Sequence, residues 1–248
     1  MGNLFRAEWF KLMKDPVFRL LITVLVAVSA LYPLLMFFDT GDPVLMDELY
    51  MYNILGGNNY VIRLVPCVLA GFFISSEYSS GTMKSIAASG NSRPRIYTAK
   101  LIVYSAGSVL IALVLPVVMT GVSSLYFGFD HMPELDYYVQ TIGLTMLYAA
   151  AFASIMALFS SIFTDSGRAI AFLLLFFLLI DSILYLLASK LALFEFFFNY
   201  SIFKLLVDVP RILMTDSTDW FALLSVPALT FAVFGLLGSW LYNRKEIK

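Results

Sequence analysis

The chain has 248 residues, of which 60% are hydrophobic and only 13% are charged. A soluble domain carries about 25% charged residues, so this composition excludes an ordinary water-exposed globular protein. With a mean hydropathy of +0.86 and a formal net charge of −1, the chain is predicted to be a polytopic membrane protein.

The residue types that carry most catalytic and metal chemistry are scarce. There is one Cys, Cys67, and one His, His131, so we expect neither an internal disulfide nor a cluster with metal-ligand spacing. Neither of the nucleotide-binding patterns G-x-x-x-x-G-K-[ST] and G-x-G-x-x-G occurs. We therefore expect no enzyme activity and no directly bound cofactor, and any ATP with its Mg would bind a separate subunit.

Residues 3–15 precede the first long apolar stretch and have the pattern of an amphipathic helix. One face carries Leu4, Phe5, Trp9, Leu12 and Met13, and the other carries Arg6, Lys11 and Lys14. This predicts an interfacial elbow helix within residues 1–16 that stops at Pro16. The helix either only anchors the topology or adds a second contact surface for a cytoplasmic partner, and the sequence leaves both interpretations open.

Six segments are long and apolar enough to cross a bilayer, which requires about 20 mainly apolar residues per helix. They cover residues 17–38, 60–76, 99–126, 137–163, 168–188 and 220–242. We expect both termini in the cytoplasm, because Lys and Arg then concentrate on the inner side. The inner Lys and Arg are Arg6, Lys11, Lys14, Arg19, Lys84, Arg93, Arg95, Lys100, Arg168, Arg244, Lys245 and Lys248, against Arg63, Lys190, Lys204 and Arg211 outside.

The segment 189–219, between the fifth and sixth predicted spans, is too apolar for a solvated loop and too interrupted for a span. Short re-entrant or interfacial helices on the outer face are the expected result, since backbone at membrane depth must be covered by protein. We see no linker to a second domain and treat residues 1–248 as one transmembrane domain.

The most informative segment follows the second predicted span and covers residues 77–98. Ser79-Ser80-Gly81 permits a sharp turn, and residues 82–88 can form two helical turns parallel to the membrane. Ser92 is the expected N-cap of the next helix, with Pro94 in its first turn. We expect Glu77 to hold the turn by pairing with Lys84, Arg93 or Arg95. The alternative is a plain re-entry loop whose charges only satisfy the positive-inside rule.

The spacing of polar residues in this segment resembles permease subunits of the ABC-2 type. The patterns are Glu77-Tyr78-x-x-Gly81-Thr82-x-Lys84, then Ser92-Arg93-x-x-Ile96-Tyr97-x-x-Lys100, together with Glu8-x-x-Lys11-Leu12 near the N-terminus. The closest branch serves lantibiotic immunity, bacitracin resistance and export of amphipathic peptides. The resemblance implies two permeases and two ATPases, with a coupling helix that docks in a cleft of the ATPase. The coupling residues would be Glu77, Gly81, Thr82, Met83, Lys84, Ser85 and Ile86.

Asp181 is the one acidic residue deep in a predicted span. A charge at the centre of a membrane helix costs about 2.5–3.5 kcal/mol on insertion scales. Asp181 is either a substrate-facing or gating acid, or a carboxyl that hydrogen-bonds Ser or Tyr on a neighbouring helix. No Lys or Arg within a span is evident as its partner.

Glycines are also predicted to mark places where helices approach closely. The glycines concerned are Gly121, Gly143, Gly167, Gly235 and Gly238.

Together these patterns predict an all-α bundle of six spans with an N-terminal elbow helix. The predicted function is the membrane subunit of an ABC exporter in a bacterial cell membrane, paired with itself or a similar chain and with an ABC ATPase, and with no nucleic acid partner. Its expected cargo is an amphipathic peptide of the lantibiotic or cytolytic type, or a lipophilic drug. The alternatives are an ion-coupled secondary carrier and a non-transporting membrane scaffold. An intramembrane enzyme is disfavoured because Asp181 stands alone.

Overall fold

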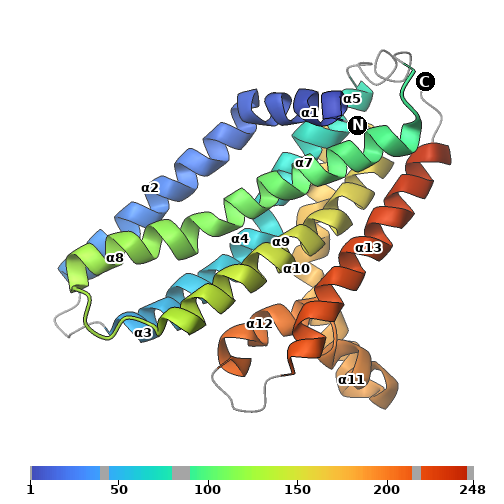
Figure 1. Cartoon of the computed structure of the whole chain (residues 1–248). Helices are drawn as coiled ribbons and strands as arrows, with labels where there is room; N and C mark the ends of the chain where they lie inside the picture. The colour runs from blue at the N-terminus through green and yellow to red at the C-terminus, as the bar shows by residue number, and fades with distance from the viewer. Residues whose placement is uncertain (1, 40–44, 80–89, 214–218, 245–248) are drawn as a thin grey trace.

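The structure is a computed structural model that describes residues 2–39, 45–79, 90–213 and 219–244, and these residues form helices and no strand. Within the described residues, six helical runs are long and apolar enough to cross a membrane (Figure 1). The runs are Pro16–Phe38, Met46–Ser75, Arg93–Phe127, Leu135–Ile162, Ser166–Lys190 and Trp220–Arg244. The predicted all-α class with six spans is confirmed, whereas the assignment of the whole chain to one domain stays a prediction.

The N-terminal helix α1 (Gly2–Lys14) and the first span α2 (Pro16–Asp39) are separate helices joined at Asp15. Asp15 Oδ1 accepts hydrogen bonds from the backbone N–H groups of Val17 at 2.8 Å and Phe18 at 3.0 Å. This is how an N-cap residue satisfies the free donors of a helix start. Proline suits the first position of a helix because it has no N–H to leave unpaired. The predicted break at Pro16 is therefore where α2 begins, and α1 lies across one end of the bundle in Figure 1.

The second span begins about 14 residues earlier than the sequence predicts. One continuous helical run comprises α3 (Met46–Glu48), the π-helical η1 (Leu49–Leu55), α4 (Gly56–Ala70), the π-helical η2 (Gly71–Ser75) and α5 (Ser76–Ser79). The Gly56-Gly57-Asn58-Asn59 sequence reads as a turn, which is why the predicted span started at Tyr60. In the fold, Tyr50, Ile54 and Asn58 are buried against the other helices, and this packing outweighs the weak local helix propensity.

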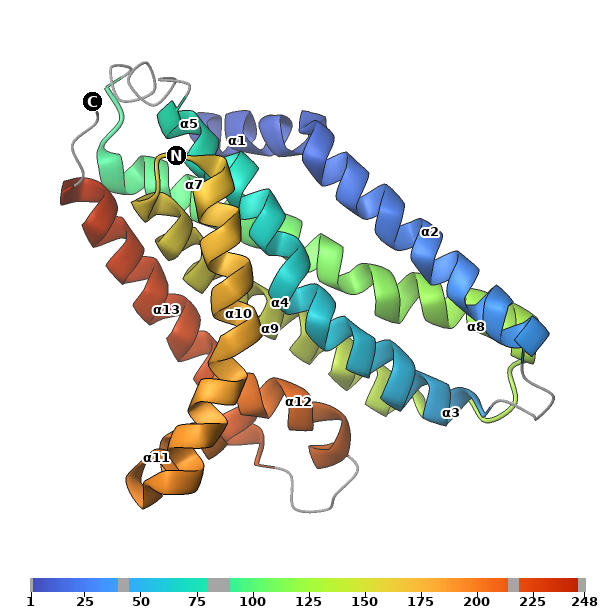
Figure 2. The ribbon, with the colours of Figure 1, turned by 180° about the vertical axis from the view of Figure 1, so that it is seen from behind.

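The remaining spans agree with the prediction more closely. They are α7 (Arg93–Val114), continued by the π-helical η3 (Leu115–Met119) and α8 (Thr120–Phe127), then α9 (Leu135–Ile162), α10 (Ser166–Lys190) and α13 (Trp220–Arg244). Helix α9 is central and packs against α4, α7, α10 and α13, while α2 lies against η3 and α8. The view from behind in Figure 2 shows α4 and α10 in front of α9.

Two short helices, α11 (Ala192–Asn199) and α12 (Ile202–Ile212), lie between the fifth and sixth spans. Ser201 caps α12, since its hydroxyl accepts a hydrogen bond from Lys204 N at 3.2 Å. The buried face of α12 packs against α4, α9 and α13. Helices are thus present where the sequence predicts them, and their re-entry into a membrane stays a prediction.

The two ends of the bundle are named here by their helices. The α1 end holds α1, α5, the start of α7 and the end of α13. The α12 end holds α3, the end of α8, α11 and α12 (Figures 1 and 2).

Candidate functional site: a buried ion network at the α1 end

Helix α1 turns Glu8 and Leu12 toward the bundle. Glu8 is 4% exposed and Leu12 is fully buried, whereas Phe10 and Met13 are exposed. The predicted apolar face is therefore right for Leu12, but it omits a buried carboxylate. A carboxylate is rarely buried unless it is paired, and its partner comes from another helix.

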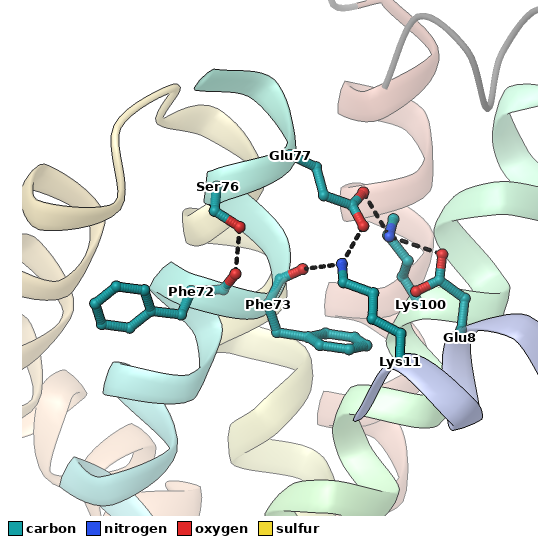
Figure 3. Close-up of polar contacts among 7 residues, drawn as sticks. All are labelled: Glu8, Lys11, Phe72, Phe73, Ser76, Glu77 and Lys100. Carbon is teal, nitrogen blue, oxygen red and sulfur yellow. Dashed lines mark hydrogen bonds and ion pairs between the residues drawn. The ribbon is translucent and has the colours of Figure 1, made fainter. Parts of the chain in front are cut away.

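That partner is Lys100 on α7, whose side chain is 2% exposed. Lys100 Nζ lies 2.8 Å from Glu8 Oε1 and 2.6 Å from Glu77 Oε2. Glu77 stands on α5, so the Lys100 ammonium joins α1 to the helix that ends the second span. The contacts are drawn in Figure 3.

A second ammonium completes the cluster. Lys11 Nζ pairs with Glu77 Oε1 and donates a hydrogen bond to the backbone oxygen of Phe73 at 3.2 Å. Lys11 Nζ also lies 4.5 Å from the centroid of the Phe73 ring, and Lys100 Nζ lies 5.6 Å from it. An aromatic face attracts a cation at such distances, so the Phe73 ring adds to the binding of both ammonium groups.

We call Glu8, Lys11, Glu77 and Lys100 the ion network. Its two carboxylates and two ammonium groups balance in charge. A buried charge is tolerated only when it is paired, and removing one partner of a buried pair costs about 3–5 kcal/mol. The network therefore locks α1, α5 and α7 to one another.

Two residues of the ion network, Glu77 and Lys100, lie on either side of residues 80–89, which include most of the predicted coupling residues. Helix α5 ends at Ser79 and α7 begins at Arg93, so Glu77 and Lys100 fix the two chain ends that lead into residues 80–89. Of the predicted coupling residues the structure describes Glu77. The others, Gly81, Thr82, Met83, Lys84, Ser85 and Ile86, lie outside the described residues.

Two partners of Glu77, Lys11 and Lys100, were not named in the sequence analysis, and its expected pairing with Lys84, Arg93 or Arg95 stays a prediction. The prediction considered Lys84, Arg93 and Arg95 because they are near in sequence, whereas Lys11 is 66 positions away. Two signals were available: the Glu8-x-x-Lys11 spacing on one helix, and the occurrence of Lys100 inside an apolar predicted span.

Helix α13 is tied to the same end of the bundle. Arg93 Nη1 donates a hydrogen bond to the backbone oxygen of Asn243 at 3.1 Å. The rings of Tyr97 and Tyr242 lie 5.6 Å apart. At its expected N-cap position, Ser92 has extended backbone but makes no capping hydrogen bond through its side chain.

Asp181 has a partner, which corrects the sequence analysis. It pairs with Arg63 of α4, whose side chain is 7% exposed compared with 41% for Asp181. Arg63 Nη2 also donates a hydrogen bond to the backbone oxygen of Phe203 at 2.8 Å. The sequence analysis counted Arg63 among the outer charges because it lies only three residues after the predicted start of the second span at Tyr60. With a helical run over 46–75, Arg63 lies well within that span.

No group of three or more His, Cys, Asp and Glu residues that could hold a metal ion occurs within the described ranges. Cys67 is buried, and its thiol donates a hydrogen bond to the backbone oxygen of Arg63 at 3.1 Å. This hydrogen bond lies within α4, to which both residues belong.

Six apolar helical runs, joined by ion pairs between helices, define a multi-pass membrane protein. The chain belongs to the ABC-2 family of transporter proteins, because the family model described as ABC-2 family transporter protein matches residues 4–180. It is thus a transport component and not itself catalytic, and the family implies an ABC ATPase as partner. The match includes the whole ion network and ends one residue before Asp181. No curated protein matches the chain, and its assignment to the lantibiotic and bacitracin branch stays a prediction.

Proposed function

We propose that this chain is the permease subunit of an ATP-driven exporter in a bacterial cell membrane, and that a separate ABC ATPase subunit binds at the α1 end and hydrolyses ATP with Mg. In this arrangement both termini face the cytoplasm. The observation that carries the proposal is the ion network, which joins α1 to the helices on either side of residues 80–89.

Coupling requires that a displacement at the ATPase reaches the membrane helices without being lost in a soft connection. Residues 81–86 lie between α5 and α7, and these two helices are locked to each other and to α1, which fits this requirement. A force applied to the segment moves α5 and α7 together, because separating these helices would break the buried ion pair between Glu77 and Lys100. Since α1 shares the same charges, it moves with them, which favours its role as a second contact surface over that of a passive anchor.

A pair of permeases is supported by the uneven burial of the spans. In the most apolar 18-residue stretch of each span, the share of residues buried within the chain is 61–67% for the second, third and fourth spans. It is 17% for the first, 11% for the fifth and 22% for the sixth. The apolar surfaces of α2, α10 and α13 are therefore available to lipid and to a second permease, either an identical chain or a similar one.

The proposed cargo is an amphipathic molecule already in the bilayer: a lantibiotic or cytolytic peptide, or a lipophilic drug. The described spans offer such a molecule mostly apolar and aromatic surface, with exposed side chains such as Leu175, Leu179 and Ile183 on α10. Extraction from the membrane requires this kind of surface rather than a broad hydrated channel.

The test of the function is purification of the chain from its native host in mild detergent, with detection of a co-purifying ATPase. We expect the ATPase with the wild-type chain and its loss with the double substitution Met83→Asp and Ile86→Asp. A matched control, Lys190→Gln, removes an exposed charge at the α12 end and should keep the ATPase. A folded, monodisperse wild-type sample without any ATPase would contradict the proposal.

One observation favours a second candidate, the ion-coupled carrier. Such carriers use paired ionisable residues within spans, and Arg63 with Asp181 is such a pair. The test uses vesicles that contain the purified chain alone, without ATPase. Uptake or efflux of the amphipathic cargo driven by a proton gradient would support the carrier. Membership of the ABC-2 family favours the permease.

A further inference from the structure

A pocket of about 320 Å³ lies between α10, α11 and α12. Its apolar wall includes Tyr185, Phe198, Phe203 and Val207. Small-molecule sites are mostly apolar, with volumes of about 300–1,000 Å³ and a few placed polar groups. The pocket has the size and the lining of such a site.

Two charged side chains, Lys204 and Asp181, line this pocket. They differ in whether an atom of the charged group remains without a hydrogen-bond partner. Lys204 Nζ is 3.0 Å from one carboxylate oxygen of Asp208 and 2.8 Å from the other, so its charge is neutralised by its own helix. Asp181 pairs with Arg63 through Oδ2, and its Oδ1 accepts no hydrogen bond from any residue that the structure describes. The polar group left open to a ligand is thus a carboxylate oxygen.

The Arg63–Asp181 pair is also unequally buried. The Arg63 side chain is 7% exposed and that of Asp181 is 41% exposed, so the negative end of the pair faces the pocket and the positive end is enclosed. The Arg63 guanidinium is held from behind by the Phe203 backbone oxygen and lies 5.8 Å from the Phe152 and Phe203 ring centroids. These contacts keep the arginine in place and leave Asp181 Oδ1 free to accept a hydrogen bond.

We propose that this pocket binds the ammonium group of a cationic amphiphile, with Asp181 Oδ1 as the acceptor and the apolar part of the ligand along Tyr185, Phe198 and Val207. The nearby aromatic rings add attraction for a cation. The inference deepens the proposed function and rests on it, since it places the recognition of an amphipathic cargo at the α12 end, far from the ion network. It also gives Asp181 a role as a binding residue for that cargo.

The test is direct binding to the full chain in phosphatidylcholine nanodiscs, without ATPase. The probe is a dansylated alkyl diamine, which carries one free ammonium, and the matched probe is the dansylated amino alcohol with a hydroxyl in its place. Empty nanodiscs correct for partitioning into lipid. We expect saturable binding of the ammonium probe, and clearly weaker binding of the hydroxyl probe.

Three variants separate the contributions. Asp181→Asn keeps the size of the side chain and a hydrogen bond to Arg63. It should lower the affinity for the ammonium probe about tenfold or more, as expected for loss of a hydrogen bond between charged groups. The affinity for the hydroxyl probe should change little. Val207→Trp fills the pocket without changing its charge and should lower the affinity for both probes. Glu195→Gln removes an exposed carboxylate of α11 and should change neither.

Equal affinity of Asp181→Asn and wild type for the ammonium probe, in samples that remain monodisperse, would overturn the proposal. Equal affinity of the wild type for the two probes would do the same. Because no ATPase is present, failure here leaves the permease function untouched if the ATPase co-purifies. Conversely, binding without a co-purifying ATPase would remove the exporter and keep the pocket.

Discussion

The two charged clusters of this protein contrast in how completely they are enclosed. At the α1 end, Glu8, Glu77 and Lys100 are each 5% exposed or less, and they form a charge-balanced network with Lys11. Toward the α12 end, Arg63 is buried but Asp181 is 41% exposed and keeps one oxygen open. The first arrangement can only hold helices together, whereas the second leaves a charged group for a ligand.

The glycines at the two ends also differ, in how much space surrounds the position of an added Cβ. A Cβ added at Gly107 would lie 3.1 Å from Leu12 of α1, and one at Gly235 would lie 3.1 Å from Leu101 of α7. At Gly238 it would overlap the Tyr97 ring. Toward the α12 end, a Cβ at Gly121 or Gly143 would meet no described heavy atom within 4 Å. Helices thus approach closely at these glycines of the α1 end, which suits a rigid connection to an ATPase, whereas Gly121 and Gly143 lie on the exposed surface of the bundle.

The largest effect should come from breaking the ion network at its centre. Lys100→Met keeps most of the apolar stem but removes the ion pairs of Lys100 with the buried Glu8 and Glu77, so we expect a loss of about 3–5 kcal/mol in the free energy of unfolding. The measurement is reversible unfolding by SDS in mixed micelles, with α-helical circular dichroism as the readout.

The matched substitution for this test is Lys204→Met, which removes a lysine that is 36% exposed. It should cost less than about 1 kcal/mol. If Lys100→Met and Lys204→Met destabilise the chain equally, the contrast between an enclosed and an open cluster is wrong.

A smaller effect, with a definite order, is expected for the Arg63–Asp181 pair. Asp181→Leu leaves a guanidinium that is 7% exposed without its carboxylate, whereas Arg63→Met leaves a carboxylate that is 41% exposed and can be hydrated. We expect Asp181→Leu to cost about 2–4 kcal/mol, below the full cost of breaking a buried pair, and Arg63→Met to cost less. The same unfolding assay ranks them, and the reverse order would contradict the burial asymmetry on which the proposed pocket depends.

Packing offers an independent test of the contrast. Gly238→Ala places a methyl group against Tyr97, and overpacking of this kind costs about 1–3 kcal/mol. Gly121→Ala has open space around its Cβ, and should be neutral or stabilise the helix by up to about 1 kcal/mol, since alanine is the better helix former. Thermal unfolding followed by size-exclusion chromatography would show a lower midpoint only for Gly238→Ala. Equal midpoints for the two variants would refute the difference in helix approach.

Much of the fold was predictable because it depends on local composition. Six apolar stretches, the break at Pro16 and the start of α7 near Ser92 follow from hydropathy and from proline chemistry. The second span was misplaced because glycine and asparagine at 56–59 suggest a turn, and only packing against other helices makes them helical. Among the five glycines predicted to face a helix, Gly235 and Gly238 do so, whereas Gly121 and Gly143 do not. A glycine in a span does not reveal which face is covered.

The candidate site was predictable in part. Glu77 could be singled out as a charge at the end of a span, but its partners could not. Lys11 lies 66 positions away in sequence, and Lys100 belongs to the next span. Ion pairs between helices depend on rotation and register, which one sequence without its fold does not supply. The partner of Asp181 was missed for the same reason, and because Arg63, close to the predicted start of its span, was counted among the outer charges.

Salt provides the finest test of the comparison. Lys204 and Asp208 form an i,i+4 pair with both side chains partly exposed, and such pairs contribute about 0.3–0.5 kcal/mol, which salt screens. The stability difference between wild type and Lys204→Gln should therefore shrink toward zero between low and high salt. The difference between wild type and Lys100→Met should persist, because buried pairs are screened far less. If the effect of Lys100→Met also disappears at high salt, then water and ions reach the network, and it cannot serve as a rigid connection between the proposed ATPase contact and the spans.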